Sequence, residues 1–403
     1  MDVSLVLIPL MAVLAPLAAR GLGRWVRIPV VVFELVLGIV IGPSLLGWAH
    51  PSAFVQTLSQ FGLAMLFFVA GTEIDPTALR GRTGSRALWG WLISLAAGVL
   101  VGLTAAPGEG AVIVGVALAS TALGTLLPVL RDAGELGTGF GRSVSALGAV
   151  GEFGPLVAIS VFLGSRAPGP ATIVLGVFAL LAAGAIWYAF AVPRGALHRV
   201  VGATLHTSGQ FAMRVVLLIL AALVALSVFL DIDMLLGAFT AGIVWRVLIR
   251  DAAESDRREV ESKIEAVAFG FLVPVFFIYT GITFDLRSLI AQPMLLLLVL
   301  ATLVILLVVR GIPSLLAAPP GSSRRDRLAV GLMGATGLPI IVAVTAIGVD
   351  KGILAGSGAA VLVGAGMLSV LLFPWLATTI RREPAGRSRL GSREHTEPGS
   401  GEG

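Results

Sequence analysis

Residues 146–163 read Ala-Leu-Gly-Ala-Val-Gly-Glu-Phe-Gly-Pro-Leu-Val-Ala-Ile-Ser-Val-Phe-Leu, in which Glu152 is the only ionisable residue. A helix needs roughly 17–25 apolar residues to cross the hydrocarbon core of a bilayer, so this stretch is long enough to span it. A carboxylate at that depth costs several kcal/mol unless it is neutral, paired or facing water, and such residues usually mark an ion or proton path. The stretch therefore predicts a membrane helix with a functional acid.

The composition of the whole chain agrees with a membrane protein. Apolar residues make up 57% and charged residues 13% of the 403 residues, and the mean hydropathy is +0.99. Soluble domains have roughly 25% charged residues. The chain has no cysteine, which excludes disulfides, thiolate nucleophiles and cysteine metal sites. Its net charge of +5 does not indicate nucleic-acid binding, because the arginines follow the membrane topology described next.

Thirteen apolar runs predict thirteen membrane helices. They lie near residues 3–20, 28–46, 54–72, 87–105, 110–130, 138–164, 170–191, 211–230, 232–249, 264–283, 293–318, 327–349 and 355–380. Alternate connections, together with the C-terminal tail, then carry 24 of the 28 Lys and Arg residues, the opposite connections carry three, and Arg310 lies inside a run. The arginine-rich side is cytoplasmic by the positive-inside rule, so we expect the N-terminus outside and the C-terminus inside the cell.

The predicted helices form two blocks of five, numbers 2–6 and 9–13, offset by seven. An odd offset inverts the second block relative to the first, as in many secondary transporters. The fifth and twelfth spans pair in this scheme, and both hold small and polar residues at mid-depth. We predict broken crossing helices there, at Gly124, Pro128, Gly337 and Pro339. Two ordinary helices rich in small residues, with a kink at Pro339, are the alternative.

Several segments carry a more specific pattern. They are Pro29–Gly47, Phe61–Asp75, Leu127–Asp132 followed by Phe140–Arg142, Leu236–Gly242 and Val273–Gly281. In this order they resemble signatures of the monovalent cation:proton antiporter-2 family, which includes bacterial sodium/proton antiporters and potassium-efflux systems. The chain shows no nucleotide-binding motif that would indicate ATP-driven pumping.

The resemblance implies roles for two residues. The essential acid of the family lies in the middle of the sixth span, where Glu152 falls, and its cationic residue in the eleventh span falls on Arg310. Some electrogenic members have two adjacent acids, whereas this chain has Gly151-Glu152, so the resemblance implies electroneutral exchange of one proton for one cation. Glutamate stands where the family usually has aspartate, a departure that affects cation affinity and selectivity.

Chemistry supports these roles independently of the resemblance. A buried carboxylate holds either a proton or a cation, and Arg310 keeps its proton, so it can only be a fixed counter-charge. Arg310 would neutralise Glu152 when no cation is bound; the alternative is that it snorkels to the cytoplasmic surface. Oxygen ligands for the cation are expected from backbone carbonyls and from Ser120, Thr121, Thr125 and Thr336. Glu34 lies close to the cytoplasmic arginines of its span and is expected to be a structural acid.

We therefore predict an all-α polytopic transporter of the sodium/proton-antiporter type. The resemblance implies a homodimer in a bacterial inner membrane, surrounded by lipid, which exchanges sodium or potassium for protons and has neither a cofactor nor an enzymatic activity. The expected parts are a transporter domain (1–380) with a scaffold near 1–72 and 211–283, a linker helix at 170–191 and an ion-carrying core near 87–164 and 293–380, then a disordered cytoplasmic tail (381–403).

Two alternatives use the same fold. A proton-coupled exporter of a larger organic solute would explain the missing first acid and the glutamate at position 152. A sensor without transport activity would bind a ligand without flux. The residue pattern does not distinguish sodium, potassium and lithium, because hydroxyl and carbonyl oxygens bind all three.

Overall fold

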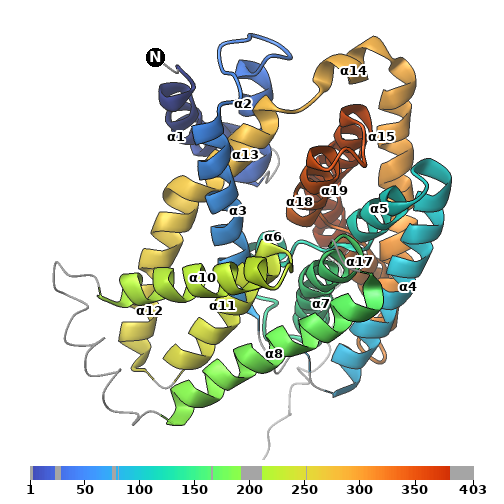
Figure 1. Cartoon of the computed structure of the whole chain (residues 1–403). Helices are drawn as coiled ribbons and strands as arrows, with labels where there is room; N and C mark the ends of the chain where they lie inside the picture. Colours follow the sequence, from blue (N-terminus) through green and yellow to red (C-terminus); the bar gives the residue numbers. More distant parts are fainter. Residues whose placement is uncertain are drawn as a thin grey trace, which may run out of the picture.

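The computed structural model describes residues 3–22, 29–74, 79, 81–164, 167–191, 211–250 and 252–381. These residues are helical throughout, without a strand (Figure 1). Ten helices among them are long and apolar enough to cross a membrane, and Val30–Ile41, Pro168–Gly184 and Met234–Ile249 are shorter apolar helices. The all-α class is confirmed, whereas the count of thirteen crossings stays a prediction. Residues 382–403, most of the predicted tail, lie outside the described residues.

The helices follow one another with short connections. The N-terminal half contains α1 (Ser4–Leu22), α2 (Val30–Ile41), α3 (Ala53–Glu73), α4 (Gly81–Ala105), α5 (Glu109–Ala119), α6 (Leu123–Asp132), α7 (Gly139–Phe162) and α8 (Pro168–Ala191). The C-terminal half contains α10 (Phe211–Phe229), α11 (Met234–Ile249), α12 (Glu254–Val267), η1 (Ala268–Leu272), α13 (Val273–Ile282), α14 (Leu286–Ala291), α15 (Pro293–Leu306), η2 (Leu307–Gly311), α16 (Ile312–Ser314), η3 (Leu315–Ala317), α17 (Arg324–Gly334), α18 (Pro339–Asp350) and α19 (Gly356–Arg381).

The helices pack as two groups. In the first, which we call the α3 group, α1, α2, α3, α10, α11 and α13 pack on one another; in the second, the α7 group, α4–α7 pack with α15 and α17–α19. Figure 1 shows the groups side by side, with α8 running across both, and α8 contacts α7 and α11. The two groups occupy the ranges predicted to be scaffold and core, and those roles stay a prediction.

The α3 group is held by two very close helix crossings. A Cβ atom on Gly281 would lie 2.9 Å from the Cα of Gly38, where α13 crosses α2. A Cβ atom on Gly242 would lie 2.9 Å from the Cα of Gly71, where α11 crosses α3. Small residues let membrane helices approach this closely. In the inverted scheme α2 corresponds to α11 and α3 to α13, so each crossing is the counterpart of the other.

We expect Gly242→Ala to lower the stability of the folded protein. The new methyl group would overlap backbone atoms of α3, which cannot move aside as a side chain can, and overpacking of this kind costs about 1–3 kcal/mol. Thermal unfolding in detergent measures the effect. The matched control is Gly176→Ala on α8, where nothing lies within 4 Å of the added atom; equal melting temperatures for the two variants would contradict the packing described here.

Two helices contain π-helical turns just before a proline. The η1 turn precedes Pro274, and the η2 turn, Leu307–Gly311, precedes Pro313. Proline has no amide hydrogen and its ring crowds the carbonyl four residues earlier, so a helix relieves the clash by widening or bending. Such π-bulges often occur at functional sites. The η2 turn carries Arg310.

Both predicted crossing helices are interrupted rather than kinked. The first is open over residues 120–122, between α5 and α6, and the second over residues 335–338, between α17 and α18. The two openings bond to each other, since the Ala122 amide donates to the Thr336 carbonyl at 2.8 Å. Broken backbone is tolerated in a membrane only where protein or water satisfies it in this way.

The individual break residues differ in their positions from the prediction. Gly337 lies in the second opening, and Pro339 is the first residue of α18, where its missing amide hydrogen costs nothing. Gly124 and Pro128 lie inside α6 instead, so the first break precedes both of them. The backbone opens at residues 120–122 because partners from other helices are available there, which the local sequence does not reveal.

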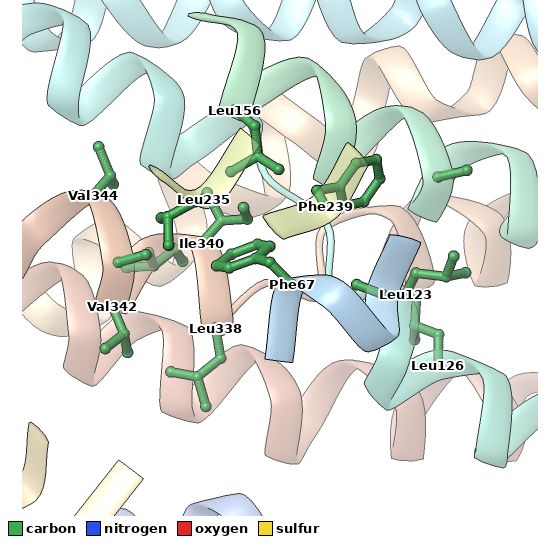
Figure 2. Packing of buried hydrophobic residues seen from close by; sticks show 14 of the residues in the cluster. Phe67, Leu123, Leu126, Leu156, Leu235, Phe239, Leu338, Ile340, Val342 and Val344 are labelled. Carbon is green, nitrogen blue, oxygen red and sulfur yellow. The ribbon is translucent and has the colours of Figure 1, made fainter. Parts of the chain in front are cut away.

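Apolar side chains fill the space between the two groups. Figure 2 shows Phe67 of α3, Leu235 and Phe239 of α11, Leu156 of α7 and Ile340 of α18 together, each at most 1% exposed. All five belong to one buried cluster. We call these five residues the apolar plug.

Candidate functional site

Glu152 lies in the middle of α7 with its carboxylate against the start of α6. The side chain is 4% exposed. Its Oε1 accepts hydrogen bonds from the backbone amides of Leu123 at 2.8 Å and Gly124 at 3.4 Å. Free amides and the positive end of the helix dipole stabilise an anion at such a position. The second oxygen, Oε2, has no hydrogen-bond partner, so one half of the carboxylate is available to a proton or a cation.

Arg310 is fully buried in the α7 group. Its Nε donates to Thr121 Oγ1 at 2.9 Å and its Nη2 to the Leu147 carbonyl at 3.1 Å. Thr121 in turn donates to the Gly334 carbonyl at 2.6 Å, at the last residue of α17. The guanidinium is thus connected to the negative end of one broken helix, whereas Glu152 caps the positive end of the other.

These contacts change two expectations for Arg310. The side chain is 0% exposed, so the snorkelling alternative is wrong. Among the described residues no hydrogen bond or ion pair joins Arg310 to Glu152, and the Nη1 of Arg310 has no partner. A counter-charge effect of the guanidinium on the carboxylate therefore acts through space in this structure.

Gly151 has no room for a side chain. A Cβ atom there would lie 2.6 Å from Thr121 Oγ1 and 2.9 Å from Arg310 Nη2. Real Cβ atoms essentially never approach other atoms so closely. The hydroxyl and the guanidinium therefore occupy the space that a first acid would need, which is a physical reason for the single carboxylate in Gly151-Glu152.

The predicted hydroxyl ligands gather around the two breaks, except for one. Ser120, Thr121 and Thr336 are all buried at the openings, and the Ser120 and Thr336 hydroxyls donate to carbonyls of their own helices. Thr125 lies within α6 and is half-buried, with its hydroxyl on the Ala122 carbonyl. Each hydroxyl keeps lone pairs for a cation.

Glu34 lies apart from this site. It is on α2, in the α3 group, and is 5% exposed. Its Oε2 has no hydrogen-bond partner.

Glu73 is a second acid at the site that the sequence did not single out. It is the last residue of α3, and a Cβ atom on Gly124 would lie 3.8 Å from its Oε2. The same Gly124 donates its amide to Glu152, and the two carboxylates interact electrostatically. At the end of a span Glu73 has the pattern of a loop residue. The tertiary fold places it beside α6, opposite Glu152.

The comparisons with known proteins agree with this geometry. A family model described as "Sodium/hydrogen exchanger, transmembrane" matches residues 10–379. The chain belongs to the sodium/hydrogen exchanger family. The antiporter family recognised from the sequence is thereby confirmed, and an exchanger family agrees with the expectation of a transporter rather than an enzyme. With ten helices that can span a bilayer, this family member is a multi-pass membrane protein.

Relatives and solved structures fit the same picture. The exchanger chain is 25% identical to the putative Na(+)/H(+) antiporter YjbQ of Bacillus subtilis, over 89% of this chain and 60% of that protein. It is 32% identical to the Na(+)/H(+)-K(+) antiporter GerN of Bacillus cereus, over 64% of this chain and 66% of that one. The chain thus spans less than two thirds of either relative.

The fold matches that of a solved antiporter. The sodium proton antiporter MjNhaP1 from Methanocaldococcus jannaschii superposes with a TM-score of 0.66, at 18% identity, over 94% of this chain and 98% of that chain. These relatives are cation antiporters, so the alternative of an organic-solute exporter gains no support.

Proposed function

We propose that this protein exchanges a monovalent cation, sodium or potassium, for protons by alternating access, with Glu152 as the shared carrier. The half-free carboxylate of Glu152 supports this proposal most directly. Oε1 is held by two amides of α6, and Oε2 is free inside a buried site. A proton and a cation therefore compete for the same oxygen, and competition for one site couples their transport.

The surroundings favour a small dehydrated cation as the competing ion. A hard monovalent cation in place of the proton needs several oxygen ligands, and carbonyls and hydroxyls of Ser120, Thr121, Thr125 and Thr336 lie at or near the breaks. The Arg310 guanidinium, held by Thr121, stays charged throughout the cycle. When neither proton nor cation is bound, its charge offsets that of Glu152, which keeps the empty site from being a lone buried anion.

Glu152 is close to an exposed face of α6. Gly124, Pro128 and Arg131 are exposed on this face, at the spacing of one helical surface. Arg131 lies at the end of α6 that the charge pattern assigns to the cytoplasm. We propose this face, with Glu73 beside it, as the route between Glu152 and the cytoplasm.

We expect Glu73→Gln to weaken cation binding from the cytoplasmic side without abolishing exchange. The carboxylate of Glu73 contributes negative charge beside the route, whereas Glu152 retains the carrier function. Removing one charge at ~6 Å in a medium between water and protein weakens a cation by roughly three- to tenfold. The measurement is the KM for the cation in inside-out vesicles, compared with kcat. A large fall in kcat with an unchanged KM would contradict this role.

The moving parts follow from the two helical groups. We propose that the α7 group, with both broken helices and Glu152, moves against the α3 group, which acts as the scaffold of a homodimer in the cell membrane. Alternating access in inverted-repeat transporters is largely such a rigid-body movement of one bundle against the other.

Proton flux in proteoliposomes tests the proposed function. With an internal pH dye, we expect sodium, potassium or lithium to trigger a pH change in vesicles that contain the protein. One carboxylate that holds either one proton or one cation implies a rate that does not depend on an imposed membrane potential. A flux that follows the potential would contradict one-for-one exchange, and silence with all three cations would contradict the antiport itself.

A further inference from the structure

A cavity of about 370 Å³ lies between the two helical groups, away from Glu152. Residues of α3, α11 and α13 form one wall, and residues of α18 and α19 form the other. The connections between α10 and α11, α13 and α14, and α18 and α19 meet at its rim. The charge pattern assigns these connections to the outer face of the membrane.

Three carboxylates line the cavity, those of Asp233, Asp285 and Asp350, and no Lys or Arg is among its described lining residues. The nearest lysine, Lys351, donates its Nζ to the Leu163 carbonyl at the end of α7. Asp350 interacts electrostatically with the Tyr279 phenol, which belongs to the other wall. The cavity therefore carries net negative charge on both of the groups that would move against each other.

The cavity ends at the apolar plug. Leu235 belongs both to the plug and to the cavity lining, and Glu152 is not part of that lining. In this structure the plug separates the cavity from the carboxylate, as alternating access requires when the other side is exposed.

The inverted repeat relates this cavity to the surroundings of Glu73. In sequence, α3 ends in Gly71-Thr-Glu-Ile-Asp75, and α13 ends in Gly281-Ile-Thr-Phe-Asp285. The glycines are the paired crossing residues described above, so Thr283, a lining residue, is the counterpart of Glu73. Likewise α18, which lines the cavity, corresponds to α6. The cavity thus occupies in one half the place that the exposed face of α6 occupies in the other.

The size of the cavity suits a hydrated ion. A water molecule takes roughly 30 Å³ in the liquid, so the cavity is much larger than a bare cation. An ion there keeps its water shell, and the carboxylates act on it by long-range attraction, which raises the local cation concentration.

We propose that this cavity is the outer vestibule of the exchanger, where Asp285 and Asp350 concentrate hydrated monovalent cations before the α7 group exposes Glu152 to the outside. The proposal rests on the proposed antiport. It adds the outer route, its sign of charge and the residues responsible.

The absence of cysteine from the chain permits a direct test by single-cysteine labelling. Ala346 is an exposed lining residue on α18, so Ala346→Cys is the reporter. Thr104 is exposed at the outer end of α4, outside the cavity, so Thr104→Cys is its control. Both are labelled in right-side-out vesicles with a positively charged and a negatively charged membrane-impermeant methanethiosulfonate reagent. The quantity measured is the ratio of the two rates.

Asp350→Asn is the variant that tests the charge. Asp285 caps α14 through Ser288, and Asp233 caps α11 through the Leu235 amide while burial raises its pKa, so Asp350 is the acid that is safest to neutralise. Glu109→Gln removes an exposed charge from the same side, outside the cavity, and is the matched control.

We expect the rate ratio at Ala346→Cys to favour the positive reagent over its value at Thr104→Cys. One charge at ~8 Å in water changes each rate roughly twofold, in opposite directions for the two reagents, so Asp350→Asn lowers the ratio about fivefold at low salt. High salt removes the difference, and Glu109→Gln leaves the ratio unchanged. A ratio equal to that of Thr104→Cys, no effect of Asp350→Asn, or labelling only from the cytoplasmic side would overturn the proposal.

Labelling does not depend on transport, which separates this inference from the proposed function. Labelling as expected without any cation-dependent proton flux would leave the vestibule standing and remove the antiport. With active protein, Asp350→Asn should raise the KM for external cation about twofold at low salt and leave kcat unchanged. Normal flux with charge-independent labelling would remove the vestibule alone.

Discussion

Glu152→Gln should reduce cation-dependent proton flux to the level of empty liposomes while the protein remains folded. Glutamine has nearly the same shape and can still accept the α6 amides through its carbonyl oxygen. It can neither release a proton nor offer an anionic oxygen to a cation, so both halves of the exchange are lost together. Sodium, potassium and lithium should all be inactive substrates for the variant.

The control for this variant is Glu34→Gln. Glu34 is also buried and also has an unpartnered Oε2, but it lies in the α3 group, apart from the breaks. We expect Glu34→Gln to retain exchange, with at most a change in stability. Flux in Glu152→Gln equal to that of wild type would remove Glu152 from the mechanism, and equal loss in both variants would point to a general effect of buried acids on folding.

Arg310→Met should abolish exchange and lower the melting temperature in detergent. Methionine fills much of the same space without a charge, and it leaves Thr121 Oγ1 and the Leu147 carbonyl without their donor. Hydrogen bonds to a charged group contribute about 1.5–3 kcal/mol each. The loss of two predicts a destabilisation that thermal unfolding readily detects.

Arg310→Lys separates the two effects of this residue. Lysine keeps the positive charge but lacks the planar donors that reach Thr121 and Leu147 together. We expect it to lower the melting temperature as Arg310→Met does and yet to retain measurable exchange. Full exchange in Arg310→Met would show that no counter-charge is needed beside Glu152.

The features of the site that the sequence predicted are those in which a single residue departs from its surroundings. Glu152 and Arg310 are charges inside apolar runs, and desolvation makes such residues expensive wherever the helices pack. The all-α class and the two interrupted helices also follow from local patterns. Membrane depth allows few other backbone conformations.

What the sequence could not predict depends on partners from distant helices. The first opening lies at residues 120–122 rather than at Gly124 or Pro128, because Thr336 and Gly151 satisfy those amides. Arg310 bonds to Thr121 and Leu147 instead of pairing with Glu152.

By itself, the sequence determined a membrane-embedded helical exchanger with one acid and one arginine at depth, because burying charge in an apolar run is costly whatever the fold. The tertiary structure decided which atoms those charges meet. It placed Glu73 beside Gly124, left no room at Gly151 and enclosed an acidic cavity above the apolar plug. Contacts of this kind join residues far apart in the chain, and their energies depend on distances that only the packed helices define.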